Sequence, residues 1–201
     1  GGAGADTLYV DGATGVSISA GAGIETAFGN VGNDVFDGSD LTTSAYFDGG
    51  DGNDILTGGS GNDTLSGGTG NDILIGYSGD DTITIDGSGD KTVDGGPGTD
   101  SLTISYGSIT SMGDFTVGVS GDYTSLTDAD GNVILYKSIE TLVVGGNSYV
   151  GVYAGLGTNG STFNTSGMYQ NTESFNADSS LNTLNFGNNI ISSANFDATN
   201  N

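Results

Sequence analysis

Carboxylates recur at a fixed spacing of nine residues in the first half of this chain. The series runs through Asp54, Asp63, Asp72 and Asp81. Calcium takes six to eight oxygen ligands, drawn largely from carboxylates and backbone carbonyls. Bare carboxylates stacked this closely would repel one another at a cost of about 1 kcal/mol per close pair even in water. The spacing therefore predicts a row of sites for a hard divalent cation.

The elements that must position these carboxylates are three consecutive nonapeptides over residues 49–75, GGDGNDILT, GGSGNDTLS and GGTGNDILI. Each divides into a six-residue turn, in which glycine permits positive φ, and a three-residue strand of β-forming residues. Leu56, Leu65 and Leu74 hold the eighth position and point inward by the alternation of a strand. Two repeats close one coil, so each repeat stacks on the next but one, about 4.8 Å away. We expect two parallel sheets around a narrow aliphatic core.

The pattern G-G-x-G-N-D-x-[I/L]-x resembles the calcium-binding nonapeptide of RTX (repeats-in-toxin) proteins. The resemblance implies an all-β fold, a right-handed parallel β-roll with almost no helix, in which about four to five calcium ions bridge stacked turns. A glycine-rich linker with solvated acids would not keep so strict a register. The implied metal ligands are Asp6, Glu25, Asp34, Asp54, Asp63, Asp72, Asp81 and Asp100, with the turn glycines Gly49, Gly50, Gly52, Gly58, Gly59, Gly61, Gly67, Gly68 and Gly70.

Turns two repeats apart are expected to share an ion. The expected pairs are Asp34 with Asp54, Asp54 with Asp72, Asp63 with Asp81, Asp81 with Asp100, and Asp6 with Glu25, whose longer arm could still reach an ion.

Some repeats depart from the pattern. Val16 and Lys91 stand where aspartate belongs. Lys91 could replace an ion by a salt bridge to Asp72, or its side chain could point to water. Residues 38–48 are two longer than a repeat, which predicts a bulged turn and the loss of one calcium site, unless Asp40 substitutes. Ile85 is one residue too many for a nonapeptide.

Composition excludes several functions. The net charge is −23 with two basic residues among 201, which argues against nucleic acid and against an anionic membrane surface. The chain has no cysteine and no histidine, so disulfides, thiolate sites and histidine-based catalysis are absent. No apolar run is long enough for membrane insertion. We expect no enzyme in these residues, although the spacing alone does not exclude an aspartate pair acting on glycosides.

The nonapeptide pattern stops near residue 104, so we divide the chain into a calcium-binding roll, 1–103, and a β-rich flanking, capping or second solenoid or sandwich segment, 104–201. Residues 115–144 alternate as strands, and Asp130-Gly131 signals a hairpin. Near the C-terminus, Phe175, Phe186 and Phe196 recur every ten to eleven residues, which fits either solenoid rungs or sandwich strands.

The function that the resemblance implies is a calcium-binding structural module of a secreted, cell-surface bacterial protein of surface-layer or adhesin type, exported by type I secretion. Its expected partners are calcium and, in a lattice, copies of itself or other surface proteins. The array begins on GGAGAD, so we expect a piece of a longer protein. The alternative is the accessory C-terminal domain of a secreted protease, lipase or alginate epimerase. Ice binding is disfavoured because GTGND occurs once; polysaccharide binding would use Tyr149, Tyr153 and Tyr169.

Overall fold

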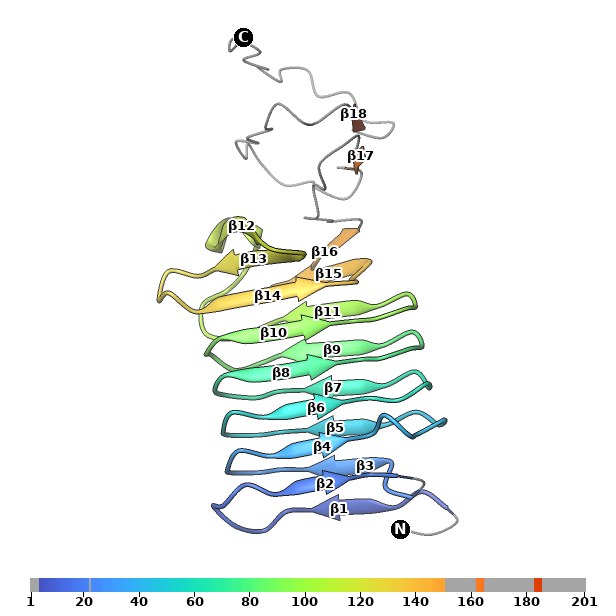
Figure 1. The fold of residues 1–201 in the computed structure, drawn as a ribbon. Coiled ribbons are helices and arrows are strands. Elements are labelled where there is room, and N and C mark those ends of the chain that lie inside the picture. Colours follow the sequence, from blue (N-terminus) through green and yellow to red (C-terminus); the bar gives the residue numbers. More distant parts are fainter. Residues whose placement is uncertain (1–3, 22, 151–161, 165–182, 186–201) are drawn as a thin grey trace.

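The computed structural model describes residues 4–21, 23–150, 162–164 and 183–185 (Figure 1). From residue 7 to residue 104 it consists of short strands separated by glycine-rich turns. These strands are β1 (Thr7–Tyr9), β2 (Ser17–Ser19), β3 (Thr26–Phe28), β4 (Val35–Asp37), β5 (Tyr46–Asp48), β6 (Ile55–Thr57), β7 (Thr64–Ser66), β8 (Asp72–Ile75), β9 (Thr82–Ile85), β10 (Lys91–Asp94) and β11 (Ser101–Ile104).

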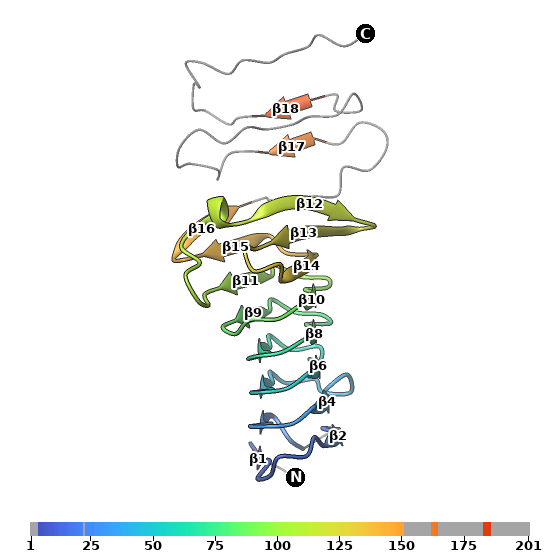
Figure 2. The same cartoon turned by 90° about the vertical axis from the view of Figure 1, so that its left-hand side faces the viewer.

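Successive strands belong alternately to two sheets on opposite sides of the stack (Figure 2). Each strand pairs in parallel with the strand two further along, so that two strands make one coil. Leu56 pairs with Leu74 in one sheet, and Leu65 pairs with Ile83 in the other. The strands from β1 to β11 therefore form a parallel β-solenoid of about five coils, which confirms the predicted β-roll.

The core lies between the two sheets and consists of a narrow row of apolar side chains. Leu56, Leu65 and Leu74 are fully buried, as their eighth position in the repeat predicts. Phe47 is also fully buried and packs against Phe36 with ring centroids 5.7 Å apart. The longer segment 38–48 therefore keeps the register of the core and places its extra residues in the turn.

Ile85 does not form a bulge. It lengthens β9 by one residue, its side chain is fully buried, and it pairs with Ile104 of β11. Ile104 pairs in turn with Val144. The extra residue thus adds a second apolar row to the core, and the solenoid is wider from β9 onward.

Past β11 the chain forms η1 (Met112–Asp114), a short 3-10 helix, and the strands β12 (Thr116–Ser120), β13 (Tyr123–Thr127), β14 (Val133–Lys137), β15 (Thr141–Val144) and β16 (Asn147–Val150). β14 pairs in parallel with β10 and β15 with β11, so one further coil follows the repeats. β12, β13 and β14 pair antiparallel, and the predicted hairpin at Asp130-Gly131 joins β13 to β14. Figure 2 shows η1, β12 and β13 beyond this last coil.

Two more strands, β17 (Thr162–Asn164) and β18 (Thr183–Asn185), pair in parallel with each other. Phe175, Phe186 and Phe196, the expected rungs, lie outside the described residues. In the described part of the chain, no helix combines the length and the apolar character that crossing a bilayer requires.

The glycine at the fourth position of each turn allows neighbouring coils to touch. Gly79 has a φ of +125°, and a Cβ there would lie 2.7 Å from the carbonyl carbon of Gly61 and closer still to its oxygen. Gly79→Ala therefore combines backbone strain with a clash, each costing about 1–3 kcal/mol. We expect a loss of about 2 kcal/mol or more in the free energy of unfolding, measured by urea denaturation in saturating calcium.

The matched control is Gly131→Ala. Its φ of +89° is also positive, but nothing lies within 4 Å of an added Cβ. We expect the smaller loss of about 1–2 kcal/mol from backbone conformation alone. Equal losses for the two variants would show that the close approach of the coils contributes nothing.

Candidate metal centre

The turns of alternate repeats stack into two columns. We call them the odd column and the even column, because the sixth residue of each turn precedes or begins an odd-numbered or an even-numbered strand. The sixth residues of the odd column are Asp6, Glu25, Ala45, Asp63, Asp81, Asp100 and Glu140. Those of the even column are Val16, Asp34, Asp54, Asp72 and Lys91. The structure thus brings the members of all five predicted acidic pairs into neighbouring coils.

One oxygen of each carboxylate is bound to the preceding coil. The backbone N–H of Asp34 donates to Oδ1 of Asp54 at 2.7 Å, and that of Asp54 donates to Oδ1 of Asp72 at 2.9 Å. In the odd column, Asp63 donates to Asp81 in the same way, at 2.7 Å. These bonds fix the carboxylates in a row along each edge.

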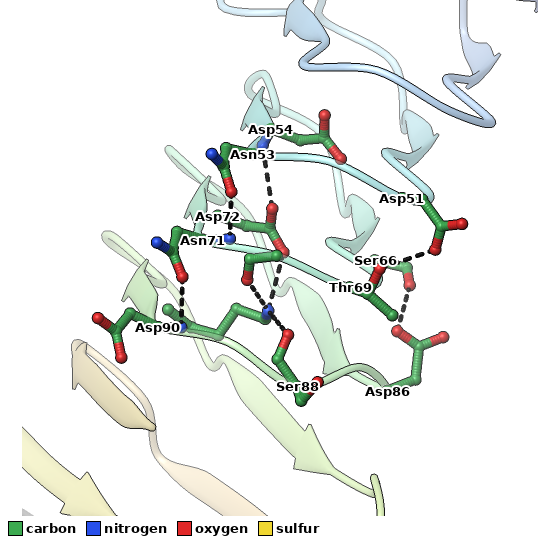
Figure 3. A network of polar contacts seen from close by, with 12 residues as sticks. Asp51, Asn53, Asp54, Ser66, Thr69, Asn71, Asp72, Asp86, Ser88 and Asp90 are labelled. Atoms are coloured by element: carbon green, nitrogen blue, oxygen red, sulfur yellow. Dashed lines mark hydrogen bonds and ion pairs between the residues drawn. The ribbon is translucent and has the colours of Figure 1, made fainter. Parts of the chain in front are cut away.

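A second ladder, made by the fifth residue of each turn, runs in the opposite direction (Figure 3). The Oδ1 atom of Asn53 accepts the backbone N–H of Asn71 in the next coil, and Oδ1 of Asn71 accepts that of Asp90, both at 2.8 Å. Asparagine meets the requirement for an acceptor without adding charge. The constant Asn-Asp dipeptide of the central repeats is therefore explained by two separate hydrogen-bonding tasks.

The second carboxylate oxygen is buried and has no hydrogen-bond partner in four of these aspartates, Asp34, Asp54, Asp81 and Asp100. Because Oδ1 is bound to the preceding coil, Oδ2 is left for the following one. A buried carboxylate oxygen without a partner costs several kcal/mol. Four such atoms at equivalent places indicate that a cation belongs there.

The glycines make room beside these oxygens. A Cβ on Gly67, at the first position, would lie 2.6 Å from Oδ2 of Asp72. A Cβ on Gly49 or Gly58 would lie 2.3 Å from the carboxylate oxygen of its own repeat. Any side chain at these positions would fill the space next to Oδ2. The second and fourth positions, Gly50, Gly59, Gly68, Gly52, Gly61 and Gly70, lie against backbone carbonyls of the preceding coil.

The donor set suits calcium when carbonyl oxygens are included. Nowhere in the described ranges do three His, Cys, Asp or Glu side chains converge on one point. An ion between two coils must therefore take most of its ligands from the backbone, and the glycine turns present carbonyl oxygens at these places. Oxygen-only coordination of this kind is typical of calcium and not of transition metals.

Burial raises the pKa of three carboxyl groups in the columns, those of Asp54, Asp81 and Asp100, well above the ordinary value of 3.8. The pKa of Asp54 rises to about 6, mainly because burial removes the carboxyl group from water. The hydrogen bond from the backbone of Asp34 lowers this pKa, and the negative charges of Asp72 and Asp34 raise it further. Burial raises the pKa of Asp81 to about 7 and that of Asp100 to about 6. Without a cation, the folded roll therefore holds these groups in an unfavourable ionised state at neutral pH.

This predicts an inverted pH dependence for the calcium-free chain. Carboxyls with a raised pKa hold protons in the folded state that the unfolded chain releases, so stability falls as pH rises from about 4 to about 7. Each unit of pKa difference is equivalent to about 1.4 kcal/mol. We expect the chelator-treated chain to be unfolded at pH 8 and to recover β structure at pH 5, as measured by circular dichroism. Greater β content at pH 8 would contradict the assignment.

Lys91 places a cation inside the even column. Its side chain is fully buried, and Nζ lies 3.1 Å from Oδ2 of Asp72, so the interpretation in which it points to water is wrong. Nζ also donates to the carbonyl of Gly70 and, at 3.0 Å, to that of Ser88. The ammonium is thus held by one carboxylate and by carbonyls from two successive coils.

The odd column contains two glutamates, Glu25 in its second coil and Glu140 in its last coil. The backbone N–H of Asp6 donates to Oε2 of Glu25 at 2.9 Å, and that of Asp100 donates to Oε2 of Glu140 at 2.7 Å. Glu140 was absent from the predicted ligands. The signal was available, because residues 140–144, ETLVV, align with residues 100–104, DSLTI.

Other predicted residues lie elsewhere. Ala45 holds the sixth position of the long turn, while Asp40 is exposed on that turn and does not enter the column. Tyr149 is buried, and its hydroxyl accepts a hydrogen bond from the backbone N–H of Met112, so it is not the exposed aromatic side chain that polysaccharide binding would use. Tyr153 and Tyr169 lie outside the described residues.

Comparison with known proteins identifies the repeats. A family model described as the RTX calcium-binding nonapeptide repeat (4 copies) matches residues 19–40 and 48–83. No curated protein matches the chain at a significant level. Among solved structures, the extracellular lipase LipA from Serratia marcescens is similar over 55% of this chain, with 26% identity and a TM-score of 0.42. The match spans 19% of that lipase chain, about a fifth of its length.

Proposed function

This chain carries RTX calcium-binding nonapeptide repeats, and from that premise we propose that it is a structural module of a secreted bacterial protein that folds when it binds calcium outside the cell. The repeats form a structural fold whose turns bind ions; they provide a scaffold and no catalytic group. The observation that carries the proposal is the set of buried Oδ2 atoms without partners, at equivalent places along both columns.

Four or five ions fit the two columns. The proposed interior sites lie between Asp34 and Asp54, between Asp54 and Asp72, between Asp81 and Asp100, and between Asp63 and Asp81. In the last of these, Oδ2 of Asp63 also accepts the backbone N–H of Gly59. A further site lies at an end of the odd column, where Glu25 or Glu140 takes the place of aspartate. Each ion would bind an Oδ2 atom together with carbonyl oxygens of the neighbouring turns.

Calcium binding of this kind couples folding to export. At the submicromolar calcium of a cell interior, carboxylate repulsion and the conformational entropy of 39 glycines favour the unfolded chain. Outside, calcium binds only to the folded state and stabilises it by mass action. Neighbouring coils share ions, so the transition is cooperative along the stack.

We place the module on the cell surface, in a protein of surface-layer or adhesin type. The support is the composition, which is rich in Gly, Asp, Asn, Ser and Thr, contains only two basic residues, and lacks cysteine. Assembly with copies of itself or with other surface proteins follows from that placement. An accessory role beside a secreted enzyme would use the same ion sites.

The test is the number of ions bound. Equilibrium dialysis against millimolar calcium, followed by metal analysis, should give four to five calcium ions per chain. Dialysis against magnesium at the same concentration is the control and should give far fewer, because magnesium demands octahedral geometry and gives up its waters reluctantly. Less than one calcium ion per chain would refute the proposal.

A further inference from the structure

The even column ends in a site that already holds a positive charge. The carboxylates Asp34, Asp54 and Asp72 follow one another, and Lys91 takes the sixth position of the next turn. After Lys91 the partner in the following coil is Ile134, which has no carboxylate. Lys91 therefore stands at the last place in this column where two successive turns could share an ion.

The contacts of Lys91 reproduce what an ion at this place would need. Its Nζ atom meets Oδ2 of Asp72, the carbonyl of Gly70 in the same turn as Asp72, and the carbonyl of Ser88 in its own turn. One coil earlier, the equivalent atoms are Oδ2 of Asp54 and the carbonyls of Gly52 and Thr69. There Oδ2 has no hydrogen-bond partner. Within the even column, the protein itself supplies a positive charge to this set of oxygens between Asp72 and Lys91, and not between Asp54 and Asp72.

We propose that Lys91 is a built-in cation that permanently fills the last ion site of the even column in place of calcium. The last two coils of the repeats, at β8 and β10, are then held together by a charge that cannot dissociate. The ion pair is fully buried on both sides, so water does not screen it. This inference rests on the proposed function, because it assumes that the equivalent places in the column bind calcium.

The decisive variant is Lys91→Asp, which restores the repeat pattern. We expect it to bind one more calcium ion than the wild-type chain, measured by equilibrium dialysis, and to fold in saturating calcium. In chelator at pH 5, where the wild-type chain is expected to recover β structure, the variant should contain less of it, because Asp72 has lost its buried ion pair with Lys91. Lys91→Met keeps the length of the side chain but removes its charge, and should gain no ion.

The matched control is Lys137→Asp, which makes the same change of charge at the other lysine of the chain. Lys137 forms a partly exposed ion pair with Asp94, 2.9 Å from Nζ to Oδ2, outside the columns. We expect no additional ion. If both variants bind the same number of additional calcium ions, the effect comes from the change in net charge and not from the position of Lys91.

Two results would overturn the inference while leaving the proposed function intact. The first is a Lys91→Asp variant that binds the same number of ions as the wild-type chain, or that stays unfolded in saturating calcium. The second is a crystal structure of the wild-type chain with calcium between Asp72 and Lys91. A wild-type chain that binds no calcium would instead refute the proposed function itself.

Discussion

Removal of calcium with a chelator at pH 8 is expected to unfold the roll, with loss of most of its β-sheet signal in far-ultraviolet circular dichroism. At a free calcium concentration about 100 times the dissociation constant, each ion contributes about 2.7 kcal/mol of stability. Four ions together would contribute roughly 11 kcal/mol, which is comparable to the whole stability of a typical domain. The loss of all four should therefore leave no folded population.

The structure gives a second reason for so large an effect. The carboxylates of Asp54 and Asp81 are almost completely buried, and their raised pKa values show that the folded state opposes their ionisation. Among the aspartates of the two columns, Asp72 is the one with a protein cation against it, Lys91. Addition of calcium in excess of the chelator should restore the signal, and addition of magnesium should not. A chain that keeps its β signal in chelator at pH 8 would show that ions are not needed for the fold.

The second large effect is expected for Asp81→Asn. Asp81 lies between Asp63 and Asp100 in the odd column, its Oδ1 accepts the backbone N–H of Asp63, and in the proposed arrangement its Oδ2 binds calcium. The amide keeps the shape and an acceptor oxygen but loses the negative charge. In saturating calcium we expect the loss of one or two ions and of roughly 3–5 kcal/mol in the free energy of unfolding, measured by urea denaturation.

In chelator the sign of the effect should reverse. The uncharged amide removes the ionisation that the folded state opposes most strongly, since Asp81 has a pKa of about 7. The calcium-free variant should therefore recover β structure at a higher pH than the wild-type chain does. A variant that is less stable than the wild type in both conditions would indicate a packing defect and not a lost ligand.

Asp80→Asn provides the control at the neighbouring position. Asp80 is exposed, its Oδ1 accepts the backbone N–H of Thr99, and Asn62 already holds the same place one coil earlier. The change of charge is identical to that of Asp81→Asn, but the side chain belongs to the outer ladder. We expect no lost ion and only a small change in stability in calcium.

The repeating part of this protein could be predicted from its amino-acid pattern. The repeat has nine residues, with glycine at positions one, two and four and aspartate at position six. This pattern permits one stacking of the turns, because a slip of one residue would expose Leu56 and bury its polar neighbours. The division of the aspartates into two columns follows from the same period. Local pattern and global fold agree here because each coil makes the same contacts with its neighbours.

Where the nine-residue period fails, the outcome depends on contacts that the pattern does not contain. Ile85 reads as an insertion, but the wider core beside Ile104 accommodates its side chain. Lys91 could have pointed to water, and its burial depends on Asp72, Gly70 and Ser88, which lie in two different turns. Glu140 joins the odd column across a separation of 40 residues from Asp100. These outcomes depend on contacts between coils, and a nine-residue pattern describes only one coil at a time.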